Sequence, residues 1–122
     1  MFDFTKNNKQ ILKNEEWQKQ LFTEGYVIIP FYSAEDIVHL KEFYNKITPT
    51  DTKGFRPTTY FHDNEYRLKA CAEILKRATP HLEEHFINYK TFMGSFIVKY
   101  NDKNSELGVH QDMTLVDESK FM

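Results

Sequence analysis

The spacing of apolar residues changes near Asn88, and this change constrains the fold more than any other feature of the chain. Before it, apolar side chains recur at helical intervals, whereas Thr91–Tyr100 (TFMGSFIVKY) is rich in the aromatic and β-branched residues that favour strands. Asn101–Ser105 is typical of a turn, and Leu107–Val116 is predicted to be a second strand. Helices first and strands last predict an α+β fold and argue against an alternating α/β fold.

Capping signals divide the helical part. A first helix is expected from about Asn8 to Thr23, with Gly25 as its C-terminal cap. Ser33 is expected to open a second helix with Asp36 as the reciprocal partner of a capping box. Pro49 ends the helical spacing of that segment, because the residue before a proline disfavours helical backbone.

The connecting segments carry further expectations. Tyr26–Pro30 is predicted to be a short buried strand at the edge or end of a sheet, because proline cannot donate to the ladder. Thr48–His62 is expected to be a long loop, a feature that often surrounds an active site. Asp63 can cap a third helix, and Pro80 is predicted to begin a fourth.

Composition indicates one domain in a reducing compartment. The 122 residues are 40% hydrophobic with a net charge of −2, so the chain lacks the basic footprint of nucleic-acid binding. Residues 1–90 are expected to be mainly helical, and 91–122 to form the first strands. Cys71 is the single cysteine, Met1–Gln10 lacks a signal peptide, and the longest apolar run, Tyr26–Tyr32, is too short to span a membrane. We therefore expect a cytoplasmic chain.

A His-x-Asp pair near the end of the sequence is its main candidate for metal binding. On a strand, His110 and Asp112 point to one face because side chains alternate. An imidazole and a carboxylate in that position are two of the three ligands of the 2-His-1-carboxylate triad that holds non-haem Fe(II). The pattern is also common by chance, and His81/Glu83 repeats it. A hydrogen-bonded strand histidine and a turn-forming aspartate remain the alternative.

The wider context of the motif resembles a known family. Ser95–Glu118, a strand with a lysine near its end followed by a variable turn and His-Gln-Asp, is similar to the phytanoyl-CoA dioxygenase family of Fe(II)/2-oxoglutarate oxygenases. Phe22–Pro30 resembles the opening of that family, and Gly54–Thr58 is also similar to it. The resemblance covers nearly the whole chain. It implies a double-stranded β-helix (jelly-roll, cupin-like) preceded by helices.

The resemblance also implies roles for individual residues. His110 and Asp112 would be metal ligands for Fe(II), with Gln111 as a supporting neighbour. Ser95 and Lys99 would line the pocket for the co-substrate 2-oxoglutarate. The implied activity is hydroxylation of a small or lipid-like substrate with O₂, giving succinate and CO₂.

The loop before the third helix offers further candidates. Thr59, with Arg56 and Thr58, is a possible contact for co-substrate or substrate. A plain turn explains Gly54 and Pro57 equally well. A solvated side chain is the alternative for Lys99.

The chain departs from the family after the motif. Members carry a distal histidine and a 2-oxoglutarate-binding arginine downstream, together with the strands that close the β-helix. No histidine or arginine follows Asp112 in this sequence, and the other four histidines precede the motif. We therefore expect an incomplete domain that holds iron weakly, is inactive alone and self-associates through open strand edges.

Two rival functions stay open. His81, Glu84 and His85 match H-x-x-E-H, in which two histidines on one helix face bind zinc and a glutamate acts as general base. A solvated helix face explains the same residues. The other rival is a non-catalytic remnant or binding module of oxygenase ancestry. Cys71, between two alanines of a predicted helix, is expected to be a buried structural thiol.

Overall fold

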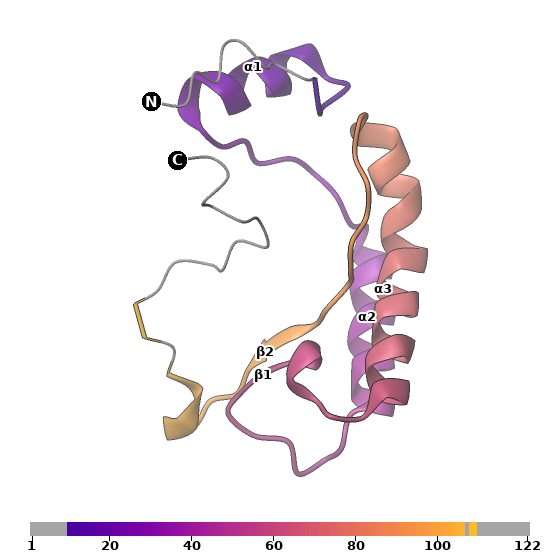
Figure 1. Cartoon of the computed structure of the whole chain (residues 1–122), viewed down its shortest axis with the longest axis vertical. Helices are drawn as coiled ribbons and strands as arrows, with labels where there is room; N and C mark the ends of the chain where they lie inside the picture. Colours follow the sequence, from indigo (N-terminus) through magenta and orange to yellow (C-terminus); the bar gives the residue numbers. More distant parts are fainter. Residues whose placement is uncertain (1–9, 107, 110–122) are drawn as a thin grey trace, which may run out of the picture.

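Two helices packed side by side, α2 and α3, form the long side of the molecule (Figure 1). The computed structural model describes residues 10–106, 108 and 109. A two-stranded antiparallel sheet lies at one end of the helix pair, and α1 lies at the other (Figure 1). The α+β class is therefore confirmed. The elements in chain order are α1 (Glu15–Glu24), α2 (Ala34–Ile47), β1 (Phe55–Pro57), the 3₁₀ turn η1 (Thr58–Tyr60), α3 (Asn64–His85), β2 (Ile97–Lys99) and the 3₁₀ turn η2 (Lys103–Ser105).

The start of α2 follows the sequence signal. Ser33 Oγ accepts a hydrogen bond from the Asp36 amide at 3.1 Å, and the Asp36 carboxylate accepts one from the Ser33 amide at 3.1 Å. This reciprocal pair satisfies two N–H groups that a helix start otherwise leaves free. The helix ends at Ile47, two residues before Pro49. The predicted capping box is confirmed.

The third helix is longer than predicted. Asp63 caps it, since its carboxylate accepts the Tyr66 amide at 3.2 Å. The prediction that Pro80 begins a separate fourth helix is wrong, because α3 runs through Pro80 to His85. Proline has no backbone N–H, so one hydrogen bond of the helix is missing at Pro80. The carbonyl group left without a donor belongs to Lys76, one turn earlier. Both Lys76 and Pro80 are exposed, so water can satisfy that carbonyl and the helix continues.

The first helix begins later than predicted. It starts at Glu15, after Asn14, whose side chain accepts the Trp17 amide at 3.0 Å. Of the predicted helical stretch that begins at Asn8, the described residues before Asn14 are not helical. Gly25 caps the end with a φ of 82°, as predicted, because a left-handed backbone favours glycine.

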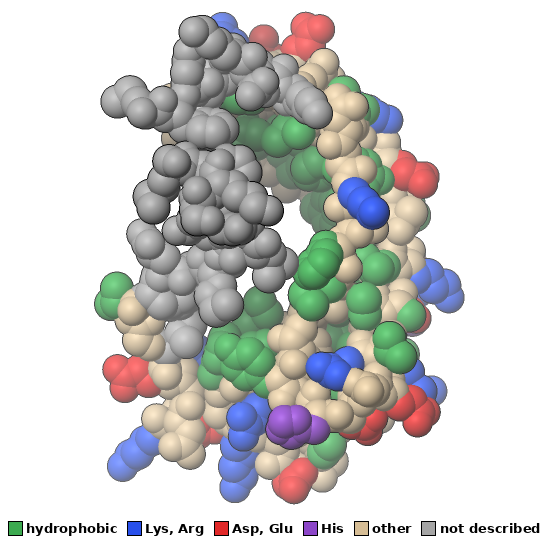
Figure 2. Space-filling view, in the orientation of Figure 1, with side chains coloured by type: hydrophobic (Ala, Val, Ile, Leu, Met, Phe, Trp, Pro, Cys, Tyr) green, Lys and Arg blue, Asp and Glu red, His purple; other side chains and the backbone are tan. Residues whose placement is uncertain are grey.

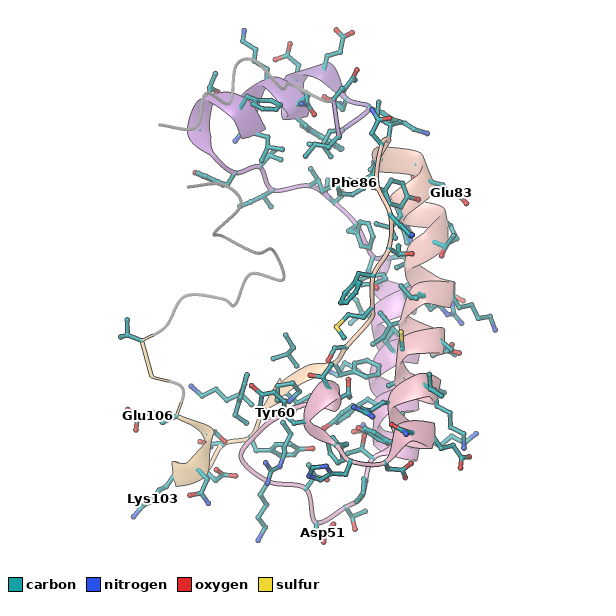
Figure 3. All side chains as sticks on the ribbon, in the orientation of Figure 1. Asp51, Tyr60, Glu83, Phe86, Lys103 and Glu106 are labelled. Carbon is teal, nitrogen blue, oxygen red and sulfur yellow. The ribbon has the colours of Figure 1, made fainter. Side chains whose placement is uncertain are left out.

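The segment before α1 docks this helix onto the end of α3. Leu12, only 2% exposed, forms an isolated antiparallel bridge with Phe86, which lies between α3 and α1 (Figure 3). Gln18 of α1 accepts hydrogen bonds from the Ile11 and Leu12 amides at 3.1 and 2.9 Å. Extended backbone, rather than a further helical turn, therefore makes this contact.

The predicted strand Tyr26–Pro30 is not a strand. Among the described residues no segment pairs with it, and a strand is defined by backbone hydrogen bonds to a neighbouring strand. Its apolar side chains alternate in exposure, with Ile28 85% exposed. The segment therefore has the pattern of a strand without the pairing.

The sheet is short, and half of it comes from the predicted loop. Phe55, Arg56 and Pro57 pair with Lys99, Val98 and Ile97 respectively. Since β1 lies between α2 and α3, the expected order of helices first and strands last is only partly correct. Within the predicted strand Thr91–Tyr100 only Ile97–Lys99 is paired, because β1 offers no longer partner. Of the predicted strand 107–116, only residues 108 and 109 are described, and neither is in a strand.

The core is small and lies where α2 meets α3. Its apolar members in this region are Leu40, Tyr44, Tyr66, Ala70 and Ala78. Other apolar side chains remain exposed, among them Phe92 at 76% and Ile97 at 70%, and such side chains gather on the face shown in Figure 2. None of the helices in the described part of the chain combines the length and apolar character needed to cross a membrane. The described sheet has two strands, and a jelly roll stays a prediction.

Candidate functional site

The two segments predicted to contact a co-substrate meet at the start of the sheet. Thr58 Oγ1 and Ser95 Oγ share a hydrogen bond of 2.8 Å. Thr58 Oγ1 also accepts the Phe96 amide at 3.1 Å, and the Thr58 amide donates to the Phe96 carbonyl at 2.9 Å. Thr58 is only 2% exposed. This junction therefore fixes the β1–η1 segment against the run that leads into β2.

Ser95 is occupied by that junction. Its hydroxyl lies 2.8 Å from Thr58 Oγ1 and 3.2 Å from the Phe96 carbonyl oxygen. A serine hydroxyl has one hydrogen to donate and two lone pairs. Ser95 thus holds the backbone in place here, and it keeps capacity to accept one further hydrogen bond.

Lys99 and Arg56 lie on opposite faces of the sheet. Residues directly opposite in an antiparallel pair share a face, so Lys99 lies with Phe55, and Arg56 lies with Val98. Both charged side chains are exposed. In the part of the chain that the structure describes, Lys99 takes part in no ion pair. A single anion between the strands could therefore not be held by both cations.

Thr59 lies in a different place from Ser95 and Lys99. It lines a pocket of about 450 Å³ between η1, α3 and the segment around Met93, together with Arg67 and Cys71. Ser95 and Lys99 do not line this pocket. The structure thus separates the predicted co-substrate residues into a sheet face and a helix-side pocket.

Cys71 is half-buried in that pocket wall rather than fully buried as expected. Its Sγ accepts the Gly94 amide at 3.3 Å. The Arg67 side chain, which also lines the pocket, donates to Asn64 Oδ1. Cys71 and Arg67 therefore each have a hydrogen-bond partner in the protein.

Asp102 anchors the sheet, a role that sequence reasoning missed. Its carboxylate accepts the Gly54 amide at 2.9 Å, the Asn104 amide at 2.8 Å and the Ser105 hydroxyl at 2.9 Å. The hydrogen bond from Gly54, followed by those from Ser105 and Asn104, lowers the pKa of Asp102. The Asp-x-Asn spacing marks the local turn, but the bond to Gly54 spans 48 residues and has no sequence signal.

The strongest predicted ligands, His110 and Asp112, lie outside the described residues, as does Gln111. Among residues 10–106, 108 and 109, no group of three or more histidine, cysteine or acidic side chains is placed to hold a metal ion. The described part therefore supplies the sheet that leads to the motif, and not a complete set of ligands.

The histidines of the rival zinc motif have partners within the fold. His81 Nε2 lies 2.7 Å from Asp36 Oδ2. His85 stacks against Trp17 with ring centroids 5.5 Å apart, and its Nε2 lies 3.9 Å from the exposed Glu84 carboxylate. Because His81 is directed to α2, these side chains act in helix packing, and nothing in this arrangement favours zinc chemistry.

A charged cluster joins α2 to α3. Arg77 lies 3.4 Å from Asp36 and 3.9 Å from Glu73, and Glu73 contacts His39 at 2.5 Å. The hydrogen bond from His81 is the largest cause that lowers the pKa of Asp36 far below its ordinary value, followed by those from Ser33 and then Arg77. Sequence reasoning missed the cluster because its contacts between the two helices join residues 34 to 45 positions apart.

No protein-family model, curated protein or solved structure matches this chain.

Proposed function

We propose that this chain is part of an Fe(II)/2-oxoglutarate-dependent oxygenase of the phytanoyl-CoA dioxygenase type, with His110 and Asp112 as metal ligands. The observation that supports the proposal is the junction between Thr58 and Ser95. It joins segment 95–99, which the family resemblance assigns to the co-substrate pocket, to segment 54–59, which offers possible contacts for co-substrate or substrate. The turn after β2 then leads directly to the motif. We extend the proposal to a jelly-roll core of which β2 is an early strand.

The donor chemistry of the chain fits this cofactor. Imidazole and carboxylate are ligands that non-haem Fe(II) accepts, and Lys99 is an exposed cation without an ion-pair partner in the described residues. When bound, iron with 2-oxoglutarate and O₂ supplies the oxidising chemistry for C–H hydroxylation. The residues of this chain would hold the metal and orient one carboxylate of the co-substrate at Lys99. Thr58, Ser95 and Asp102 would keep that strand in position.

Metal titration tests the proposal directly. Anaerobic calorimetry with Fe(II) should give His110→Ala and Asp112→Ala variants at least tenfold weaker binding than the unmodified chain, because each loses a ligand. His62→Ala is the matched control, since His62 is an exposed histidine of the same chain. Equal affinity in all four proteins would contradict the oxygenase proposal. It would favour the alternative of a non-catalytic binding module.

Co-substrate binding tests the role of Lys99 separately. With Fe(II) present, 2-oxoglutarate should bind the Lys99→Ala variant several-fold more weakly than the unmodified chain. Lys103→Ala, which removes an exposed cation in the neighbouring turn η2, should leave the affinity unchanged. An equal loss in both variants would indicate a general charge effect and remove Lys99 from the proposed site.

Two further properties belong to the same proposal. The outer edges of the short sheet lack strand partners among the described residues, which supports self-association by strand addition. A single cysteine supports a cytoplasmic location. The proposed substrate is a small or lipid-like molecule.

A further inference from the structure

A second groove lies between α2 and β2. Its volume is about 460 Å³, and Leu40, Tyr44, Phe96 and Val98 contribute to its wall. Val98 lies on the face of β2 opposite to Lys99, because side chains alternate along a strand. The groove is therefore separate from the proposed co-substrate face. Its size falls within the roughly 300–1,000 Å³ range of small-molecule sites.

The two tyrosine hydroxyls at the groove are satisfied by each other. Tyr44 Oη and Tyr100 Oη share a hydrogen bond of 2.7 Å. Burial, and then this hydrogen bond, raises the pKa of Tyr44, so the Tyr44 phenol stays neutral at physiological pH. The exposed residues Asn45 and Lys41 add polar groups to the lining, and the rest of the wall is aliphatic and aromatic. A ligand that enters here needs an apolar body and meets no unpaired hydroxyl.

One cation lies at this groove without a counter-ion. Lys41 of α2 is exposed and contributes to the lining, which contains no acidic side chain. In the described part of the chain it forms no ion pair, whereas Lys69 on α3 pairs with Glu65 at 2.8 Å. Arg56, opposite Val98, lies on the same face of the sheet but lines a different pocket. The charge of the groove is therefore complementary to an anion.

We propose that this groove binds a monomeric medium-chain alkyl carboxylate. The hydrocarbon would lie along Tyr44, Phe96 and Val98, and the carboxylate would pair with the Lys41 ammonium. A lysine suits this position because its aliphatic stem can lie on an apolar wall while its charge stays in water. The pocket near Thr59 differs in its cation, which is Arg67 and which donates a hydrogen bond to Asn64.

The test is a titration of the full ¹⁵N-labelled chain with decanoate below its micelle concentration, followed by amide chemical shifts. We expect saturable shifts at Leu40, Tyr44 and Val98. Lys41→Ala should weaken binding about tenfold, the order expected for loss of one charge-assisted contact. Lys46→Ala, at the end of the same helix but outside the groove, is the matched control and should bind normally. Decyltrimethylammonium, with the same chain and the opposite charge, should bind at least tenfold more weakly than decanoate.

Several results would overturn the proposal. Equal binding of the two surfactants, or no effect of Lys41→Ala, would show adsorption without charge recognition. Shifts confined to Thr59 and Cys71 would place the ligand in the other pocket. Binding only to anionic vesicles would assign the surface to a membrane, and a dimer dissolved by Val98→Phe would assign the groove to a second copy of the chain. None of these results depends on His110 or on iron, so they are separable from the oxygenase proposal.

Discussion

His81 of α3 donates its Nε2 hydrogen to Oδ2 of Asp36, in the first turn of α2, across 2.7 Å. The same carboxylate closes the capping box with Ser33 and accepts a longer contact from Arg77 at 3.4 Å. One residue therefore both starts a helix and fixes that helix against its neighbour. The relationship explains why Asp36 is buried although it is ionised.

Asp36 should make stability depend on acidic pH. Its pKa in the folded chain lies below the ordinary value of 3.8, so near and below that pH the unfolded chain binds more protons than the folded one. The contribution of Asp36 to the free energy of unfolding is therefore complete above about pH 5, and it is lost as the pH falls through the folded pKa. Asp36→Asn should show a smaller loss of unfolding free energy between pH 6 and pH 3 than the unmodified chain. Urea denaturation at the two pH values measures this.

The control for Asp36 is Glu35→Gln, which removes an exposed acid from the same helical turn. It should keep the pH dependence of the unmodified chain. If Asp36→Asn and Glu35→Gln gave the same pH dependence as the unmodified chain, the contacts of Asp36 with His81 and Ser33 would not be those of an ionised carboxylate in solution.

The Thr58 hydroxyl should stabilise the junction between β1 and β2. Thr58→Val keeps the shape of the side chain but leaves the Phe96 amide and the Ser95 hydroxyl without their partner. We expect a loss of about 1–3 kcal/mol in the free energy of unfolding, the usual consequence of an unsatisfied buried polar group. Thr59→Val is the matched comparison and should change stability by less than about 0.5 kcal/mol. Equal effects of the two variants on chemical denaturation would refute a special role for Thr58.

Gly94 should tolerate no side chain. A Cβ at this position would lie 2.8 Å from Ile74 Cγ2 and 2.9 Å from Ile74 Cβ, closer than packed atoms allow. Gly94→Ala should therefore destabilise the chain by about 1–3 kcal/mol through overpacking. At Gly108 an added Cβ meets no atom of the described residues within 4 Å, so Gly108→Ala serves as the comparison in thermal unfolding. A Gly94→Ala variant as stable as this control would show that the segment before β2 does not pack on α3 in this way.

Leu12 should hold α1 on the end of α3. Leu12→Ala removes a side chain that is 2% exposed, and we expect a loss of about 2–5 kcal/mol if α1 unfolds together with the rest of the chain. Ile28→Ala, at a residue 85% exposed, should have little effect. Hydrogen exchange of the α1 amides distinguishes the possibilities. Faster exchange confined to α1 would mean that this helix opens as a separate unit, and unchanged exchange would contradict the docking described for Leu12 and Phe86.

The starts of α2 and α3 and the α+β class could be predicted because their signals lie close together in the sequence. Ser33 and Asp36, three residues apart, carry the capping box, and Gly25 supplies the one backbone conformation that ends α1. The predictions failed where a partner decides the outcome. Tyr26–Pro30 has a strand-like pattern but no neighbour, and the FRP tripeptide of β1 has a neighbour that its own sequence does not indicate. The prediction that Pro80 begins a new helix failed for a related reason. Lys76 is exposed, so water can satisfy its carbonyl group and the helix can continue.

The candidate site divides in the same way. The sequence by itself determined the residue types: the His110-x-Asp112 spacing, the cation at Lys99, and the residues that cap the starts of α2 and α3. Only the tertiary structure decided that Thr58 bonds to Ser95, that Thr59 lies apart from Lys99, that Asp102 anchors Gly54 and that His81 bonds to Asp36. The physical reason is range. The spacing of side chains predicts helix caps and local turns, which depend on residues close together in the sequence. Contacts between residues 37 to 48 positions apart exist only once the helices and strands have packed.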